Sequence, residues 1–525
     1  MKTEQGRRIK QRTVAASAAL IIILTIFSRP FGILREILTA VYFGARIELD
    51  SFLLAASVPI FLCTILGGGL VQSIVPGLSD AAEGDENRGW EILTRLTGIT
   101  VMAALPLVAL NLLIAPFVIR FLFPPHATPD MLEKAVHTYR LLSFAIMGGM
   151  LSGLFVGAAN TFHLYGYTTL RSIAYNSMIV LSLFLFHGVL GIFSLGVGIL
   201  LAEYSQLFVV VPPLWKRGFR LQRGGASTGR SVGIVVGAYL PAVLLTGMNH
   251  VNYLVDRTLA MPLGEGCVSS LHYAWKLILL PASLLSVAFA TPLLTFLSRH
   301  EARKERMEAG VLMQKTFGIL LFFAIPVTFF LVVSCREIVI LFYDWGKFDS
   351  KGVYLTSTAL LLYAPGLPFQ LLLPLYIAGF LSIKKAWIPV LVSLPLVPLN
   401  WFLDRVLMNT FSHAGIALST SLVFFLNGAI LYYLLSRFHL PPIGAGTFGK
   451  RRFSYPISIM VFFTMILLSH QIGRYAGPPH RVLIILELIL VGMITMGGYL
   501  LLAHLFDIPV LRYFPSFIKR KTGED

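Results

Sequence analysis

Charged side chains are scarce in this sequence. Asp, Glu, Lys and Arg make up 13% of its 525 residues, whereas 56% of the residues are hydrophobic. Soluble globular domains carry about 25% charged residues, so this composition, with a mean hydropathy of +0.78, excludes an ordinary soluble protein. Apolar segments close to the roughly 20 residues that a helix needs to cross a bilayer recur from end to end. A β-barrel would show short alternating segments instead, so we predict an all-α, polytopic membrane protein.

Cysteine is rare, and the common catalytic motifs are missing. The three cysteines, Cys63, Cys267 and Cys335, stand far apart without a CxxC pair, which argues against a disulfide framework and a zinc site. The sequence contains no HExxH, P-loop or GxSxG motif. We therefore expect a transporter rather than an enzyme, with no cofactor and no metal. Without a nucleotide motif, transport would draw on an ion gradient, the membrane potential or substrate flux.

Acidic residues are also few within the apolar segments. The main examples are Glu36, Glu203, Asp256 and Glu487. None of them has a second acid at short spacing, as a membrane enzyme such as a glycosyltransferase would use for acid–base chemistry. A cation-coupled drug exporter would favour acids in its cavity, and a channel would need a selectivity-filter signature. Both classes are therefore less favoured alternatives.

Basic residues outnumber acidic ones by 42 to 25, which gives a net charge of +17. Such an excess can mark a nucleic-acid-binding protein, but Lys and Arg also gather in the cytoplasmic loops of membrane proteins. If the N-terminus is inside the cell, every basic segment falls on the cytoplasmic side: 2–12, 216–225, 298–306, 384–385, 449–452 and 518–521. We predict cytoplasmic N- and C-termini and no nucleic-acid partner.

Fourteen apolar segments are candidate membrane spans. The first is too long for a cleaved signal peptide, so we expect it to be retained. The divisions within 168–214 and within 386–436 are the weakest, because the connections there are short. The predicted spans are 14–43, 51–78, 92–122, 137–163, 168–187, 190–214, 231–258, 268–297, 312–334, 352–380, 386–404, 414–436, 453–472 and 482–506.

An internal sequence repeat divides the chain into two halves. Gly98 and Pro106 follow a charged loop after an apolar helix that ends at "LS", and Gly318 and Pro326 repeat this pattern 220 residues later. An even number of spans separates the copies, so the two halves run in the same direction, as in transporters with parallel repeats. We predict an N-lobe at 1–225, a C-lobe at 226–445, and a C-terminal helix pair with a cytoplasmic tail at 446–525.

Arg29, Arg35 and Glu36 lie in the first apolar segment. A charge at mid-bilayer costs at least about 2.5–3.5 kcal/mol, so it normally faces a cavity or a partner. Arg29 and Glu36 are seven residues apart and share a helix face, so an ion pair that only joins helices is one interpretation. A cationic cavity for an anionic ligand is the other, and Lys276 in the second half supports it, although Lys276 could instead extend toward the membrane interface.

The stretch "FSRPFGILREILTAVYFG" (27–44), followed by Asp50 in "LDSF", resembles the first helix and first loop of the MurJ/MviN family. These are lipid II flippases of the multidrug/oligosaccharidyl-lipid/polysaccharide exporter superfamily. Nearly the whole chain is covered, and the order and spacing of the matches are specific. Further matches are "VQSIVPGLSD" (71–80), "GAANTF" (157–162) with Asn176, "LFYDWGKFD" (341–349), "SIKKAW" (382–387) and "HAGIALSTSLVFFLNGAILYYLL" (413–435).

The resemblance implies a two-lobed, fourteen-helix flippase that works by alternating access in the bacterial cytoplasmic (inner) membrane. Its cargo would be lipid II, the undecaprenyl-diphosphate-linked peptidoglycan precursor. Its partners would be the bilayer and the cell-wall synthesis machinery. Family arginines that bind the diphosphate in a central cavity correspond to Arg29, Arg35 and Lys276. Asp50 matches an acid near the periplasmic gate, and Glu36 is expected as a charge partner or gate residue. The last two helices would form a groove for the prenyl tail.

The sequence departs from the family pattern on the second helix. Cys63 and Thr64 stand where the family often has two arginines, Gly68 stands in place of a glutamate, and Lys276 replaces an arginine. Arginine binds phosphate oxygens bidentately, whereas lysine acts as a point charge. Another prenyl-diphosphate-linked oligosaccharide, of O-antigen or exopolysaccharide type, is therefore the alternative cargo. The glycines of "ILGGGL" (65–70) would allow close helix approach or a bend, both of which are structural roles.

Overall fold

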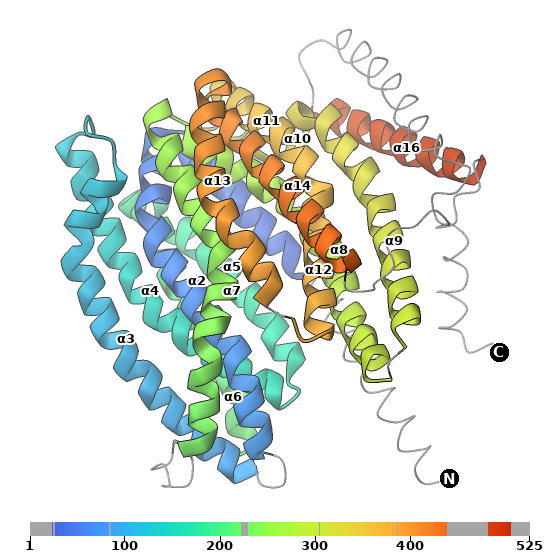
Figure 1. Cartoon of the computed structure of the whole chain (residues 1–525). Coiled ribbons are helices and arrows are strands. Elements are labelled where there is room, and N and C mark those ends of the chain that lie inside the picture. The colour runs from blue at the N-terminus through green and yellow to red at the C-terminus, as the bar shows by residue number, and fades with distance from the viewer. Residues whose placement is uncertain are drawn as a thin grey trace. The chain divides into compact units, whose positions relative to one another are not determined.

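The computed structural model describes residues 24, 27–82, 86–221, 229–303, 305–385, 387–437 and 481–505. Every regular element in these ranges is a helix, and they contain no strand (Figure 1). Nine helices within the described ranges are long and apolar enough to cross a membrane. Helices satisfy their backbone hydrogen bonds internally, which a chain in the hydrocarbon layer requires. The prediction of an all-α, multi-pass membrane protein is confirmed.

The chain forms two compact units, of which the first comprises Met1–Ser269 and Trp345–Asp349. The loop Trp345–Asp349 belongs to it because the backbone N–H of Lys347 donates to the Val41 carbonyl at 2.9 Å. Within this unit α2 packs against α4 and α7, and α5 packs against α6. Its helices are a segment at 27–43, α2 (Ile47–Ala82), α3 (Glu86–Leu122), α4 (Pro129–Thr161), α5 (Tyr165–Leu190), α6 (Phe193–Lys216), α7 (Gly229–Ala260) and the 3₁₀ helix η2 (Met261–Leu263).

The second unit comprises Ser270–Asp344 and Ser350–Asp525. In it α14 packs against α11, α12 and α13, while α9 contacts α12 and α16. Its helices are α8 (Cys267–Ala302), which begins in the first unit, α9 (Arg306–Val333), α10 (Cys335–Tyr343), α11 (Ser350–Tyr363), the 3₁₀ helix η3 (Ala364–Gly366), α12 (Leu367–Ser382), α13 (Trp387–Phe411), α14 (His413–Arg437) and α16 (Arg481–Leu505).

The predicted spans agree with the helices wherever their residues are described. The two weak divisions fall where expected, since α5 ends at Leu190 and α13 ends at Phe411. The predicted span 352–380 is interrupted by η3, because Pro365 has no N–H with which to continue the helical hydrogen bonding. The predicted span 453–472 lies outside the described residues, so the total of fourteen stays a prediction.

The predicted lobes and the two units are different divisions of the chain. The contacts place α7 in the first unit because it packs against α2, whereas the repeat placed it in the C-lobe. The lobes at 1–225 and 226–445 and the C-terminal segment 446–525 stay predictions. In one detail the sequence interpretation is wrong: α2 and α8 do not end at "LS" but continue to Ala82 and Ala302.

Glycines allow α2 and α4 to pack with their backbones in contact. A Cβ built on Gly67 would lie 2.5 Å from the carbonyl oxygen of Gly149. A Cβ on Gly153 would overlap the carbonyl oxygen of Gly67 in turn. Small residues at such positions stabilise helix pairs in membranes through close van der Waals contact. The interpretation of "ILGGGL" as a close-approach sequence is confirmed for Gly67.

Candidate binding site

Arg29 has no hydrogen-bond or ion-pair partner among the residues that the structure describes. Its side chain is half-buried in the helical segment 27–43. Within the described residues it makes no hydrogen bond or ion pair, and its Nε atom is buried without an acceptor. An arginine in an apolar segment is costly unless it meets an anion or water. A role for Arg29 in binding an anionic ligand stays a prediction.

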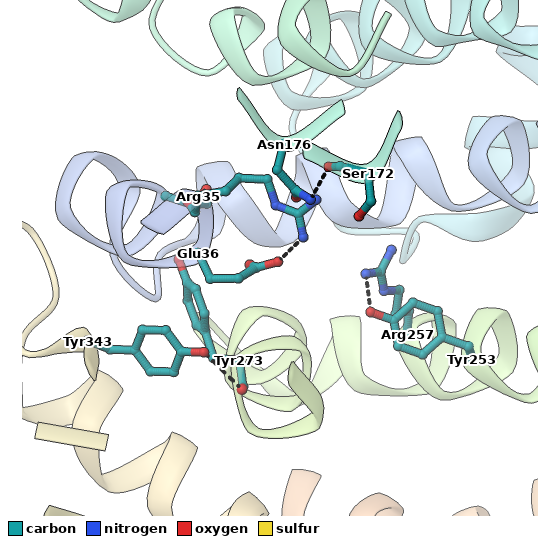
Figure 2. A network of polar contacts seen from close by, with 9 residues as sticks. Arg35, Glu36, Ser172, Asn176, Tyr253, Arg257, Tyr273 and Tyr343 are labelled. Atoms are coloured by element: carbon teal, nitrogen blue, oxygen red, sulfur yellow. Dashed lines mark hydrogen bonds and ion pairs between the residues drawn. The ribbon is translucent and has the colours of Figure 1, made fainter. Parts of the chain in front are cut away.

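Glu36 is paired with its neighbour Arg35 instead. The Arg35 guanidinium forms an ion pair with the Glu36 carboxylate, and Glu36 is buried. Figure 2 shows this pair, with the guanidinium directed toward Asn176 of α5. The sequence interpretation of an Arg29–Glu36 ion pair is wrong, because spacing along a helix identifies a shared face but not the partner. Glu36 is a charge partner, as predicted, but its partner is Arg35.

Arg257 is a buried arginine that the sequence analysis missed. It lies near the end of α7 and donates to the Leu53 carbonyl at 2.7 Å and to Ser57 Oγ at 3.0 Å. It also donates to the Tyr253 hydroxyl at 2.6 Å and stacks over that ring (Figure 2). Through these hydrogen bonds the Arg257 guanidinium joins α7 to α2. The signal was available, because Arg257 stands inside the predicted span 231–258.

Asp50 connects the start of α2 to the start of α8. It is fully buried, and its two carboxylate oxygens accept from the backbone N–H groups of Gly266 and Ser269, each at 2.6 Å. The first N–H groups of a helix have no partner within the helix. A carboxylate placed there satisfies them and interacts favourably with the helix dipole. Asp50 thus caps the helix that carries Lys276.

Lys276 lies on α8, and its side chain is half-buried. Aromatic contacts within the second unit hold this part of α8. Trp275 packs against Tyr363 and Phe424, and the Tyr343 hydroxyl donates to the Tyr273 carbonyl at 3.4 Å (Figure 2). A cavity that Lys276 shares with Arg29 and Arg35 stays a prediction.

The residues that depart from the family pattern on α2 serve helix packing. Cys63 is buried against Gly149 of α4, and its thiol lies 3.6 Å from the Ala145 carbonyl oxygen. The Thr64 hydroxyl donates to the Ile60 carbonyl of its own helix at 2.8 Å. These two positions supply no cation, so positive charge in the first unit must come from other helices.

The second unit contains a buried acid that the sequence analysis did not single out. Asp404 of α13 is fully buried, and it accepts hydrogen bonds from Asn400 at 2.9 Å and from Ser419 of α14. Asn400 stands one turn before Asp404 on the same helix face, a spacing that could have revealed the pair. The cluster joins α13 to α14 by hydrogen bonds in a region where unpaired polar groups are costly.

The family assignment comes from the whole length of the chain. The sequence model of the family described as "Lipid II flippase MurJ" matches residues 39–501. The chain belongs to the lipid II flippase MurJ family. The resemblance seen in the order of the short motifs is therefore confirmed. MurJ proteins are transporters by that description, so the chain is a member of a transporter family.

Individual MurJ relatives are distant in sequence but similar in length. A probable lipid II flippase MurJ from Buchnera aphidicola subsp. Schizaphis graminum is 25% identical over 511 residues, covering 95% of this chain and 98% of the relative. One from Vibrio cholerae is 25% identical and covers 81% of this chain and 84% of the relative. These alignments extend across both units.

Solved structures agree with the fold. A structure titled "Lipid II flippase MurJ, inward closed conformation" matches with a TM-score of 0.76 at 23% identity, covering 93% of this chain and 98% of that one. A multidrug resistance MATE family transporter, titled as inward-facing, matches with a TM-score of 0.68 at 12% identity, covering 81% of this chain and 98% of that one. At these identities the similarity establishes the shared helical fold.

Proposed function

We propose that this protein moves lipid II from the inner to the outer leaflet of the bacterial cytoplasmic membrane by alternating access. The observation that carries the proposal is Arg29, a guanidinium in a membrane helix that has no partner among the described residues, in a chain of the MurJ family. The diphosphate and sugar–peptide headgroup of lipid II cannot cross about 30 Å of hydrocarbon unaided. A cationic, water-filled cavity lowers that barrier while the prenyl tail stays in the lipid.

Each predicted site residue has a role in this proposal. Arg29, Arg35 and Lys276 bind the diphosphate, and Arg29 has no partner among the described residues that would compete for its donors. Glu36 restrains Arg35 by their ion pair. Asp50 fixes the start of α8 and acts at the outer gate. A few cations suit this task because the cargo must also be released.

The protein performs no chemical conversion and uses no cofactor in this proposal. Movement is driven by the membrane potential, an ion gradient or the flux of cargo. A potential of 100 mV supplies about 2.3 kcal/mol for each elementary charge moved across it. Proteins of cell-wall synthesis, which make and consume the cargo, are the expected partners.

Genetic replacement tests the cargo. We expect this protein to restore growth and lipid II exposure on the outer leaflet in cells depleted of an essential lipid II flippase. Stable insertion without rescue, together with restored surface polysaccharide in a mutant that lacks a different flippase, would favour the alternative prenyl-diphosphate-linked oligosaccharide. An Arg29→Ala variant, produced at the same level, is the matched negative control.

We also propose that both termini are cytoplasmic. The basic segment after α6, which includes Lys216 and Arg217, and the one at 298–306 after α8 should then face the cytoplasm. Reporter fusions near residues 220 and 305 are expected to give the cytoplasmic signal. An external signal at either position would contradict this topology and the number of spans before it.

A further inference from the structure

A second polar network within the first unit joins α5 and α6. Arg171 of α5 donates through Nη1 to Gln206 Oε1 at 2.5 Å, and Gln206 Nε2 donates to Glu203 Oε2 at 2.8 Å. An arginine only donates and a carboxylate only accepts, so this order fixes the orientation of the Gln206 amide.

The network leaves part of the Arg171 guanidinium available. A guanidinium has five N–H donors. Nε donates to the Thr168 carbonyl at 3.2 Å and Nη1 donates to Gln206. Among the described residues Nη2 has no hydrogen-bond partner, and the Arg171 side chain is half-buried. Arg257, in contrast, uses both of its terminal nitrogens on protein acceptors.

Arg171 lies on α5, a helix that neighbours the first helix, where Arg35 lies. Tyr175 stands one turn after Arg171 and so lies on the same face of α5. In addition, α5 passes beside the first helix, since a Cβ built on Gly32 would lie 3.8 Å from Asn176 Oδ1. The helix that carries Arg171 is therefore a neighbour of the helix that carries Arg35.

We propose that Arg171 is a further cargo-binding residue, whose Nη2 donates to an anionic oxygen of the cargo headgroup. Glu203 acts as a positioning residue, because it holds Gln206, which in turn holds the guanidinium. This inference rests on the proposed function. Among the described residues, only part of the Arg171 guanidinium is hydrogen-bonded to the protein. A charged side chain in a membrane helix is energetically costly. Contacts with an anionic ligand would offset that cost and explain why the arginine is present. The anionic oxygen belongs to the diphosphate or to a carboxylate of the peptide.

Binding of purified protein in nanodiscs tests the proposal. We expect Arg171→Gln to bind lipid II about tenfold more weakly than the wild type, and Arg171→Lys to fall between them. Arg140→Gln is the matched control, since Arg140 is an exposed arginine of α4 in the same unit, and it should bind as the wild type does. Equal weakening with undecaprenyl diphosphate would place the contact at the diphosphate. Weakening with lipid II alone would place it at the peptide.

A double variant separates binding from structural charge pairing. In Arg171→Gln/Glu203→Gln neither residue keeps a charge, so no unpaired charge remains. A cargo-binding role predicts that this variant binds as weakly as Arg171→Gln, whereas a structural pair predicts recovery. Recovery, or unchanged binding in Arg171→Gln while Arg29→Ala has lost binding, would overturn the inference and leave the proposed function standing. If the wild type binds neither lipid, the proposed function itself is wrong.

Discussion

Arg29→Ala is expected to lower lipid II transport at least about 100-fold, equivalent to ~2.8 kcal/mol. The Arg29 guanidinium has no protein partner among the described residues. Its removal should therefore abolish a charge-assisted hydrogen bond to the cargo and break few contacts within the protein. The measurement is transport of lipid II into the outer leaflet of reconstituted vesicles, with the amount of inserted protein determined for each variant.

Arg29→Lys is the control for charge and packing. It keeps the positive charge and much of the apolar stem, but it loses the planar, bidentate geometry that arginine offers to phosphate oxygens. We expect about one tenth of wild-type transport. Normal transport in Arg29→Ala would show that Arg29 is not a cargo-binding residue. Loss of inserted protein in both variants would instead indicate a structural role.

Asp50→Ala is expected to destabilise the protein by about 2–4 kcal/mol, because two buried N–H groups lose their acceptor. Those groups belong to Gly266 and Ser269 at the start of α8. Lys276 lies on the same helix, so transport should fall together with stability. Thermal unfolding of the purified protein in detergent gives the change in stability, and the vesicle measurement gives the change in transport.

Glu48→Ala is the matched control for Asp50→Ala. Glu48 is an acid in the same first turn of α2, but its side chain is exposed. Its removal should leave both unfolding and transport unchanged. Asp50→Asn should be intermediate, since its amide offers one acceptor oxygen in place of two. An Asp50→Ala variant with unchanged unfolding but no transport would show that Asp50 acts only in gating and that the cap contributes little.

The positions of the helices could be predicted from the sequence because hydropathy is a local property. A segment such as 92–122 is apolar enough to cross the membrane in any fold, and α3 follows it closely. The interruptions within predicted spans were harder to predict. The interruption at η3 depends on Pro365, and prolines elsewhere, such as Pro106 in α3, remain inside their helices. Neighbouring helices and local adjustments can satisfy the backbone groups that a proline leaves unpaired in a membrane helix. Whether they do so cannot be predicted from the sequence of a single segment.

The sequence by itself determined that this is an all-α membrane protein of the MurJ family and that Arg29, Arg35 and Glu36 are charges within an apolar segment. Composition and motif order carry that information along the chain. Only the tertiary structure decided the partners. Glu36 pairs with Arg35 rather than Arg29, and Asp50 bonds to N–H groups more than 200 residues away.

The Arg171–Gln206–Glu203 network likewise required α5 to pack against α6. The physical reason is the range of the interactions. Residue spacing fixes the face of a helix on which a side chain lies, and it leaves open which other helix that face meets. Hydrogen bonds and ion pairs act over a few ångströms, so their partners are set by the packing of helices that are distant in sequence.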